Sequence, residues 1–218
     1  MKKLFLFAGI AAMLISCTPK NAEEAKTGEA QKVEEKSGEV LNIASESMMH
    51  WRGKKVGGEH YGVVAIKSGS IKVQDGNING GTLIIDLNSI VSEDLEGEWY
   101  DKLVGHLKSS DFFNVAEYPE ATFEIVKVEK FIGETDESLS APTHEFTGNL
   151  TIKGMAKSIS FPATIAIEDG IVKASSNEFA IDRTLWNINF KSKTVFAEFK
   201  DDYINDMINL KFEVEFSK

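Results

Sequence analysis

Strict alternation of apolar and polar residues is the feature that most constrains how this chain can fold. The C-terminal run NLKFEVEFSK alternates along its length, and the runs EFTGNLTIKG and SISFPATIAI follow the same period. A period of two is typical of a β-strand with one buried face and one face in water. Segments rich in glycine and asparagine, such as DGNINGG, separate these runs as hairpin connections do.

These patterns predict an all-β fold with one or two short helices. Sequential hairpins favour a closed antiparallel up-and-down barrel of about eight strands, because closure removes exposed edges, although a sandwich also fits. Within residues 93–107 the apolar spacing changes to i, i+3, i+4 and i+7, which predicts a helix. A barrel of this size either fills with its own side chains or holds one small ligand, and the pattern leaves both interiors open. Further strands are expected at residues 40–53, 61–67, 70–74, 81–90, 121–130 and 171–182.

The N-terminus reads as an export signal. Two lysines, an apolar run too short to span a bilayer and the box LISC predict a signal peptide over residues 1–16 and an acylated Cys17. The protein is then a lipoprotein of the cell envelope, held to a membrane by its acyl chains; the alternative is an ordinary secretory signal with an incidental Cys17. Because Cys17 is the only cysteine, no internal disulfide stabilises the folded part.

Residues 17–38 are expected to form a flexible tether, because they contain almost no large apolar side chains to bury. A short amphipathic helix is the alternative for this segment. The folded domain then spans residues 39–218 and is large enough for a sizeable core. The chain has 24 basic and 34 acidic residues, and removal of Lys2 and Lys3 with the signal leaves a net charge of −12. This charge argues against nucleic acid as a partner and against electrostatic binding to an anionic bilayer.

Residue patterns for catalysis are weak. The four histidines show no metal-ligand spacing, and no glycine-rich loop opens a helix to hold phosphates. The sequence therefore predicts no catalytic residues, no metal and no cofactor, and a protein that is not an enzyme.

Four ordered blocks resemble the YceI-like lipid- and polyisoprenoid-binding family. They are residues 51–90, the stretch HLKSSDFFNVAEYPEATFE at 106–124, residues 148–165 and the stretch FAIDRTLWNI at 179–188. The resemblance implies a lipocalin-like barrel whose lumen takes a long apolar chain, in a protein that commonly faces the periplasm. One departure is Trp186, which stands where typical members have a small residue and puts the shape of the cavity there in doubt.

The pattern and the resemblance together indicate three groups of candidate binding residues, and each group also has a purely structural interpretation. The alternating apolar faces form either a solid core or, as the resemblance implies, an open lumen. Aromatic and helical residues would close one end, and the two arginines and two histidines in the matched blocks would either hold a head group or make structural pairs. The lumen set is Leu83, Ile85, Leu87, Phe123, Ile125, Phe146, Leu150, Ile152, Ile159, Phe161, Ile165, Leu210, Phe212, Val214 and Phe216; the closing set is Tyr100, Leu103, Leu107, Phe112, Phe113 and Tyr118; the head-group set is Arg52, His60, His106 and Arg183.

The expected function is a membrane-tethered carrier that holds a long-chain isoprenoid or similar amphiphile without a chemical step. Moving each CH₂ from water into such a lumen is favourable by about 0.8 kcal/mol, but a bilayer is equally apolar, so exchange with a membrane is close to neutral. A filled barrel that serves as a structural or interaction module of the envelope is the competing hypothesis, and a hydrolase or isomerase acting on a bound lipid is the third. A homodimer is compatible with each of them.

Overall fold

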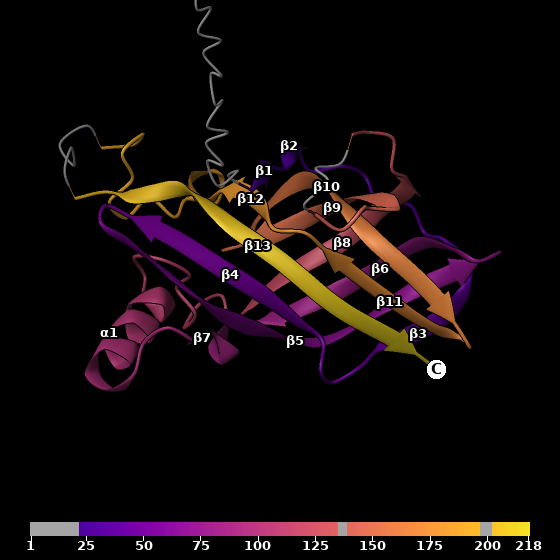
Figure 1. Ribbon diagram of the computed structural model, residues 1–218, viewed down its shortest axis with the longest axis horizontal. Coiled ribbons are helices and arrows are strands. Elements are labelled where there is room, and N and C mark those ends of the chain that lie inside the picture. The colour runs from indigo at the N-terminus through magenta and orange to yellow at the C-terminus, as the bar shows by residue number, and fades with distance from the viewer. Residues whose placement is uncertain (1–21, 135–138, 197–201) are drawn as a thin grey trace, which may run out of the picture.

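The structure is a computed structural model that describes residues 22–134, 139–196 and 202–218 (Figure 1). The signal peptide expected at 1–16 and the lipid attachment at Cys17 lie outside the described residues. No helix in the described part of the chain is long and apolar enough to cross a membrane. In order, the elements are β1 (Glu23–Glu24), β2 (Lys26–Glu29), β3 (Glu39–Ile43), β4 (Met48–Lys55), β5 (Gly58–Gln74), β6 (Asn77–Asp86), the 3₁₀ helix η1 (Leu87–Ser89), β7 (Val91–Ser92), α1 (Gly97–Lys108), β8 (Glu120–Lys130), β9 (His144–Ile152), β10 (Met155–Glu168), β11 (Ile171–Ser176), β12 (Phe179–Asp182), the 3₁₀ helix η2 (Arg183–Trp186) and β13 (Ile204–Ser217).

Eight strands close into a ring, which confirms the predicted all-β barrel. Going around the wall, β4 pairs with β5, then β6, β8, β9, β10, β11 and β13 follow, and β13 pairs with β4 again. All of these neighbours are antiparallel and follow the order of the chain, as in an up-and-down, lipocalin-like barrel. The predicted helical stripe falls on α1, which covers one end of the barrel in Figure 1.

The first described residues differ from the expected flexible tether. Residues 23–29 run between β10 and β12 as an additional wall segment, in which β1 pairs in parallel with β12 and β2 pairs antiparallel with Lys157–Ser160 of β10. Only the small side chain of Ala25, between the two strands, reaches the core, and the residues of β1 and β2 are exposed. The absence of large apolar residues is therefore compatible with order here, because backbone hydrogen bonds to two open strand edges hold the segment.

This added segment widens one half of the barrel. Toward the C-terminal end of β10, residues Ala163–Glu168 pair directly with β11, so the wall has eight strands. Toward the α1 end, β2 pairs with β10 and β12 pairs with β13. The wall between β10 and β13 therefore contains one strand more here than at the other end, where β11 alone connects them. A barrel with more strands has a larger interior. The half that α1 covers should therefore have the larger lumen.

Candidate functional site

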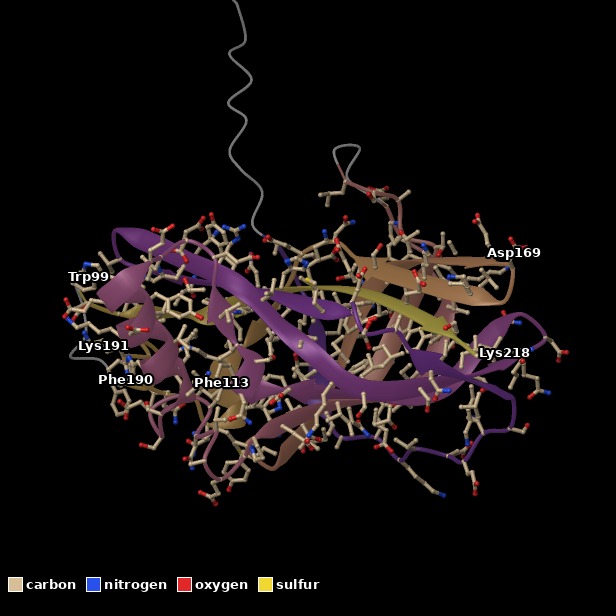
Figure 2. All side chains as sticks on the ribbon, turned by 90° about the horizontal axis from the view of Figure 1, so that it is seen from below. Trp99, Phe113, Asp169, Phe190, Lys191 and Lys218 are labelled. Carbon is tan, nitrogen blue, oxygen red and sulfur yellow. The ribbon has the colours of Figure 1, made fainter. Side chains whose placement is uncertain are left out.

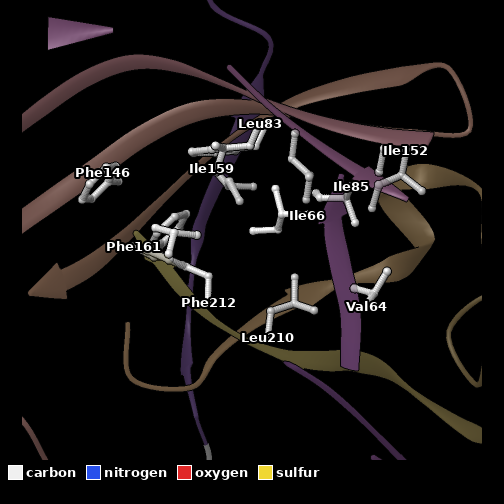
Figure 3. Close-up of a cluster of buried hydrophobic side chains, with 14 of the residues drawn as sticks. Val64, Ile66, Leu83, Ile85, Phe146, Ile152, Ile159, Phe161, Leu210 and Phe212 are labelled. Atoms are coloured by element: carbon white, nitrogen blue, oxygen red, sulfur yellow. The ribbon is translucent and has the colours of Figure 1, made fainter. Parts of the chain in front are cut away.

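A cavity of about 140 Å³ lies in this wider half of the barrel. Strands β4, β5, β6, β9 and β13 form its walls through inward side chains such as Val64, Ile85 and Ile152. Figure 3 shows these three side chains grouped on one side of the buried cluster. Of the residues predicted to line a lumen, five border this cavity: Ile85, Leu87, Leu150, Ile152 and Leu210.

The other half of the barrel is filled. Only about 30 Å³ of free space remains there, so this half fits the alternative of a solid core better than that of an open lumen. Ile165 borders neither space and is only partly buried. The remaining predicted lumen residues surround this small space and are buried: Leu83, Phe123, Ile125, Phe146, Ile159, Phe161, Phe212, Val214 and Phe216.

Five phenylalanine rings fill this half, and Phe161 lies at their centre. Its ring stacks on Phe179 at 4.3 Å between centroids and meets Phe212 edge-on at 5.3 Å. Phe123 and Phe146 lie 5.7 and 6.1 Å away. Gly148 makes room for this cluster, because a Cβ at that position would come within 2.4 Å of the Phe123 ring. We call these five residues (Phe123, Phe146, Phe161, Phe179 and Phe212) the phenylalanine cluster.

The closing residues come from α1 and the turn that follows it. Leu103 and Leu107 face the cavity from the helix, as their i, i+4 spacing requires. The helix ends at Lys108. The next residue, Ser109, caps it, because its backbone N–H and hydroxyl both donate to the carbonyl of His106, at 3.1 and 2.8 Å. The turn after this end directs Phe112 and Phe113 to the cavity. Four of the six predicted closing residues are therefore in place, whereas Tyr100 and Tyr118 do not border the cavity.

The exposed ends of the cavity elements gather at one tip of the molecule. Figure 2 shows Trp99, Phe190 and Lys191 at this tip, with Asp169 and Lys218 at the opposite one. The cavity opens here between the β4–β5 hairpin, α1 and the start of β13, where the pairing of β4 with β13 is irregular between Ile204 and Ile208. We call this opening the mouth.

Arg52 borders the mouth but its charge is already balanced. Its Nη1 lies 2.7 Å from Glu59, its Nε lies 3.3 Å from Glu178, and its guanidinium stacks over Tyr61 at 5.0 Å. Burial alone would lower the pKa of Arg52, but the two carboxylates outweigh it and raise the pKa above its ordinary value. A structural ion pair accounts for this residue.

The two predicted histidines also have partners within the chain. His60 Nδ1 lies 2.7 Å from Asp94, which also accepts hydrogen bonds from the backbone N–H of Tyr61 and the hydroxyl of Ser92. Partial burial would raise the pKa of Asp94, but these hydrogen bonds and the nearby His60 outweigh it and lower the pKa. His106 lies 3.1 Å from Asp111 and does not border the cavity.

Arg183 borders the cavity, but its guanidinium makes structural contacts within the chain. Its side chain is 1% exposed, and its N–H groups donate to the backbone carbonyls of Ile188, Phe190, Ile204 and Asn205. Asp206 lies 3.4 Å from Nη2. Burial lowers the pKa of Arg183, and Asp206 and Asp182 counteract part of that effect. The guanidinium thus ties η2 and residues 188–190 to the start of β13, beside the mouth.

Trp186 occupies the position where the sequence departs from the family pattern. Its side chain is fully buried, and its Nε1 donates to the carbonyl of Leu150 at 3.0 Å. The large ring does not line the cavity, so it supports the wall and leaves the cavity open.

Two lysines at the mouth were missed from the sequence. Lys54 and Lys55, at the end of β4, border the cavity, and among the described residues neither ammonium has a carboxylate within 4.0 Å. They belong to the run WRGKK, but nothing in the sequence distinguished them from the other 20 lysines. The described residues contain no group of three or more His, Cys, Asp or Glu side chains that could hold a metal ion.

Comparison with known proteins identifies the family of this barrel. A family model described as the YceI-like domain matches residues 41–216. Protein YceI of Salmonella arizonae is 38% identical over 60 residues, which span 28% of this chain and 27% of that protein. Among solved structures, Burkholderia cenocepacia BcnA is 23% identical with a TM-score of 0.55, over 78% of this chain and 96% of that one. A polyisoprenoid binding domain from Saccharophagus degradans, implicated in plant cell wall breakdown, is 14% identical with a TM-score of 0.55, over 82% of this chain and 97% of that one. The chain belongs to the YceI-like domain family.

Proposed function

We propose that this protein binds the apolar chain of an isoprenoid-type amphiphile in the cavity beneath α1. The observation that carries the proposal is the pairing of an apolar cavity of about 140 Å³ with a mouth bordered by Lys54 and Lys55. Cavities lined by aliphatic and aromatic side chains stay dry and accept apolar ligands of their own size. The S. degradans domain, which has the same fold, is a polyisoprenoid binding domain, and this supports an isoprenoid as the chain.

An anionic head group fits the mouth better than a neutral one. An apolar cavity offers no polar partner, so the head of a bound amphiphile stays at the opening. Consecutive strand residues face opposite sides, and Lys55 shares the inward side of Met49 and Trp51, so Lys55 is the lysine placed to donate to phosphate or carboxylate oxygens there. Arg52 contributes little there, because Glu59 and Glu178 already compensate its charge.

The membrane is the proposed source of the ligand, and acylated Cys17 is the proposed anchor. The lipobox sequence LISC supports this part of the proposal. A lipid anchor keeps the barrel at a high effective concentration beside a bilayer, and a carrier gains from this because apolar chains exchange between bilayer and cavity at little net cost. Replacing Cys17 by serine should move the protein from the membrane fraction to the soluble envelope fraction, and unchanged fractionation would exclude the anchor.

We propose binding without a chemical step. His60 is the one histidine that borders the cavity among the described residues, and its partner Asp94 is occupied by three hydrogen bonds that hold the loop before α1. A structural or interaction module is the second candidate function, because the phenylalanine cluster fills half of the barrel as that hypothesis requires.

The test compares two matched variants of the Cys17→Ser protein, purified without detergent. Ala121→Leu places a larger side chain into the cavity, whereas Ala174→Leu adds the same atoms to the filled half. Both overpack the core and cost about 1–3 kcal/mol. Native mass spectrometry with geranyl phosphate should show binding by the parent and by Ala174→Leu, and at least a tenfold loss with Ala121→Leu. Failure of the parent to bind any prenyl compound would support the structural module instead.

A second comparison tests the head group. Lys54→Gln combined with Lys55→Gln should weaken geranyl phosphate more than geraniol, because only the phosphate needs the ammonium groups. The control is Lys173→Gln combined with Lys218→Gln, which removes the same charge from exposed sites away from the cavity. Equal losses for the two ligands would argue against a head group at the mouth.

A further inference from the structure

Three side chains separate the cavity from the filled half of the barrel. Met49 of β4, Leu150 of β9 and Leu210 of β13 border both the cavity and the small space around the phenylalanine cluster. In the eight-strand ring, β9 is four strands from β4, so these residues meet from opposite walls. Figure 3 shows Leu210 between the phenylalanine side chains and the group formed by Val64, Ile85 and Ile152. We call Met49, Leu150 and Leu210 the septum.

The septum is well packed on both sides of the barrel. Leu150 and Leu210 are 3% and 7% exposed, and Met49 packs against the same core cluster. Met49 pairs across the sheet with Phe212, and Leu150 pairs with Phe123. These two rings of the phenylalanine cluster therefore support the septum. A chain that entered from the mouth would have to displace several interlocked rings to pass this point.

The cavity in front of the septum is short. A cavity of about 150 Å³ holds one benzene ring, so about 140 Å³ takes about one five-carbon isoprene unit. Leu103, Phe113 and Ile208 line the same cavity and are only partly buried, so their exposed sides offer apolar surface to one further unit at the mouth. A longer chain has no further apolar surface inside the barrel, because about 30 Å³ behind the septum is close to the volume of one water molecule.

We propose that the septum sets the length of the bound chain, and that the ligand carries a short prenyl chain of about ten carbons rather than a long polyisoprenoid. This inference rests on the proposed function, since it concerns the same cavity. The septum acts as the floor against which the methyl end of the chain stops, while the anionic head remains at the mouth beside Lys55.

The experiment measures affinity against chain length. Phosphates of prenyl chains with five, ten, fifteen and twenty carbons are titrated, without detergent, into the Cys17→Ser protein and its septum variant Leu210→Ala. Each five-carbon isoprene unit that is buried from water should raise the affinity by about three orders of magnitude, and a unit that stays outside should add less than about threefold. In the parent the gain should end at ten carbons.

Leu210→Ala removes three carbons from the floor and joins the cavity to the small space behind it. The gain in affinity should then continue to fifteen carbons. Leu41→Ala is the matched control, because Leu41 is also a buried leucine (4% exposed) but borders neither space. This variant should lose stability in a similar way and keep the limit at ten carbons. Met49→Ala, which changes a partly buried septum residue, serves as the second septum variant if Leu210→Ala does not fold.

The outcomes separate the two proposals. If the parent binds prenyl phosphates and its affinity keeps rising to twenty carbons, the septum is not a floor, although the binding function stands. The same conclusion follows if the parent has a limit that neither septum variant moves. If the parent binds no member of the series, the binding function itself fails.

Discussion

Replacing Phe161 by alanine tests whether half of the barrel is a packed core. Phe161 is 3% exposed and lies against four other rings, the nearest being Phe179 at 4.3 Å and Phe212 at 5.3 Å. Such contacts give a close-packed interior in which a deleted ring leaves a hole that its neighbours cannot fill. In an open lumen, the same ring would have empty space on one side and would contribute less.

The expected loss follows from the burial of the ring. Truncation of a core phenylalanine to alanine costs about 3–5 kcal/mol, and the small space beside Phe161 (about 30 Å³) offers little room for relaxation, so we expect about 4 kcal/mol. For a domain of this size each kcal/mol lowers Tm by about 2–4 °C, which predicts a drop of about 8–16 °C. Thermal and urea unfolding of the Cys17→Ser protein, followed by circular dichroism, measures both quantities.

Phe113→Ala is the control for this prediction. Phe113 is half-buried and borders the open cavity, so its removal enlarges an existing space and should cost about 1–2 kcal/mol. If Phe161→Ala costs no more than Phe113→Ala, the phenylalanine cluster is not a packed core and the argument for a short cavity loses its basis.

Three further predictions concern residues around the site. Arg183→Met should destabilise the protein by about 3–5 kcal/mol in urea unfolding, because it leaves four buried or partly buried carbonyls without their donor. A loss below about 1 kcal/mol would contradict the structural role. Asn149→Ala removes the side chain that both accepts from and donates to the backbone of Gln31 at 2.8 Å. Residues 23–31 should then become more sensitive to limited proteolysis while Tm changes little. Unchanged sensitivity to the protease would show that β1 and β2 hold the segment alone. Because the pKa of Asp94 is lowered in the folded protein, its contribution to stability is present above the unfolded pKa of about 4 and is lost as pH falls through the lower folded pKa. Asp94→Asn should therefore flatten the dependence of the free energy of unfolding on pH below about pH 4. An unchanged dependence on pH would refute this role of Asp94.

Each of the two main hypotheses from the sequence, a binding protein and a structural module, describes one half of the barrel. The half beneath α1 has a cavity of the kind that a binding protein needs, and the other half is filled as a structural module requires. The inserted segment 23–29 accounts for this difference, because it adds a strand to the wall only at the α1 end. The proposed ligand is therefore shorter than the long chain that the family resemblance implies.

The periodic pattern of apolar and polar residues predicted most of the fold. Alternation located the strands, and a change of period located α1, because both signals depend on side chains close together in the chain. Order in residues 23–29 could not be predicted in this way. Their side chains carry no apolar signal, and the hydrogen-bonding edges of β10 and β12 that hold them come from residues more than a hundred positions away.

The roles of charged residues were the least predictable. Arg52 and Arg183 attracted interest as the two arginines of the chain, yet one is neutralised by Glu178 and the other is surrounded by carbonyls that only the folded loops bring together. Lys54 and Lys55 carry no distinguishing sequence signal, and their importance comes from lying at the mouth without acidic partners in the described part of the chain.

The sequence by itself determined the class of fold, the family and the set of side chains that point inward, because each of these follows from local periodicity or from motifs in order. Only the tertiary structure decided whether those inward side chains meet. Whether rings from β8, β9, β10, β12 and β13 touch or leave a space depends on the width of the barrel at each level, and that width is set by which distant strand edges pair with one another.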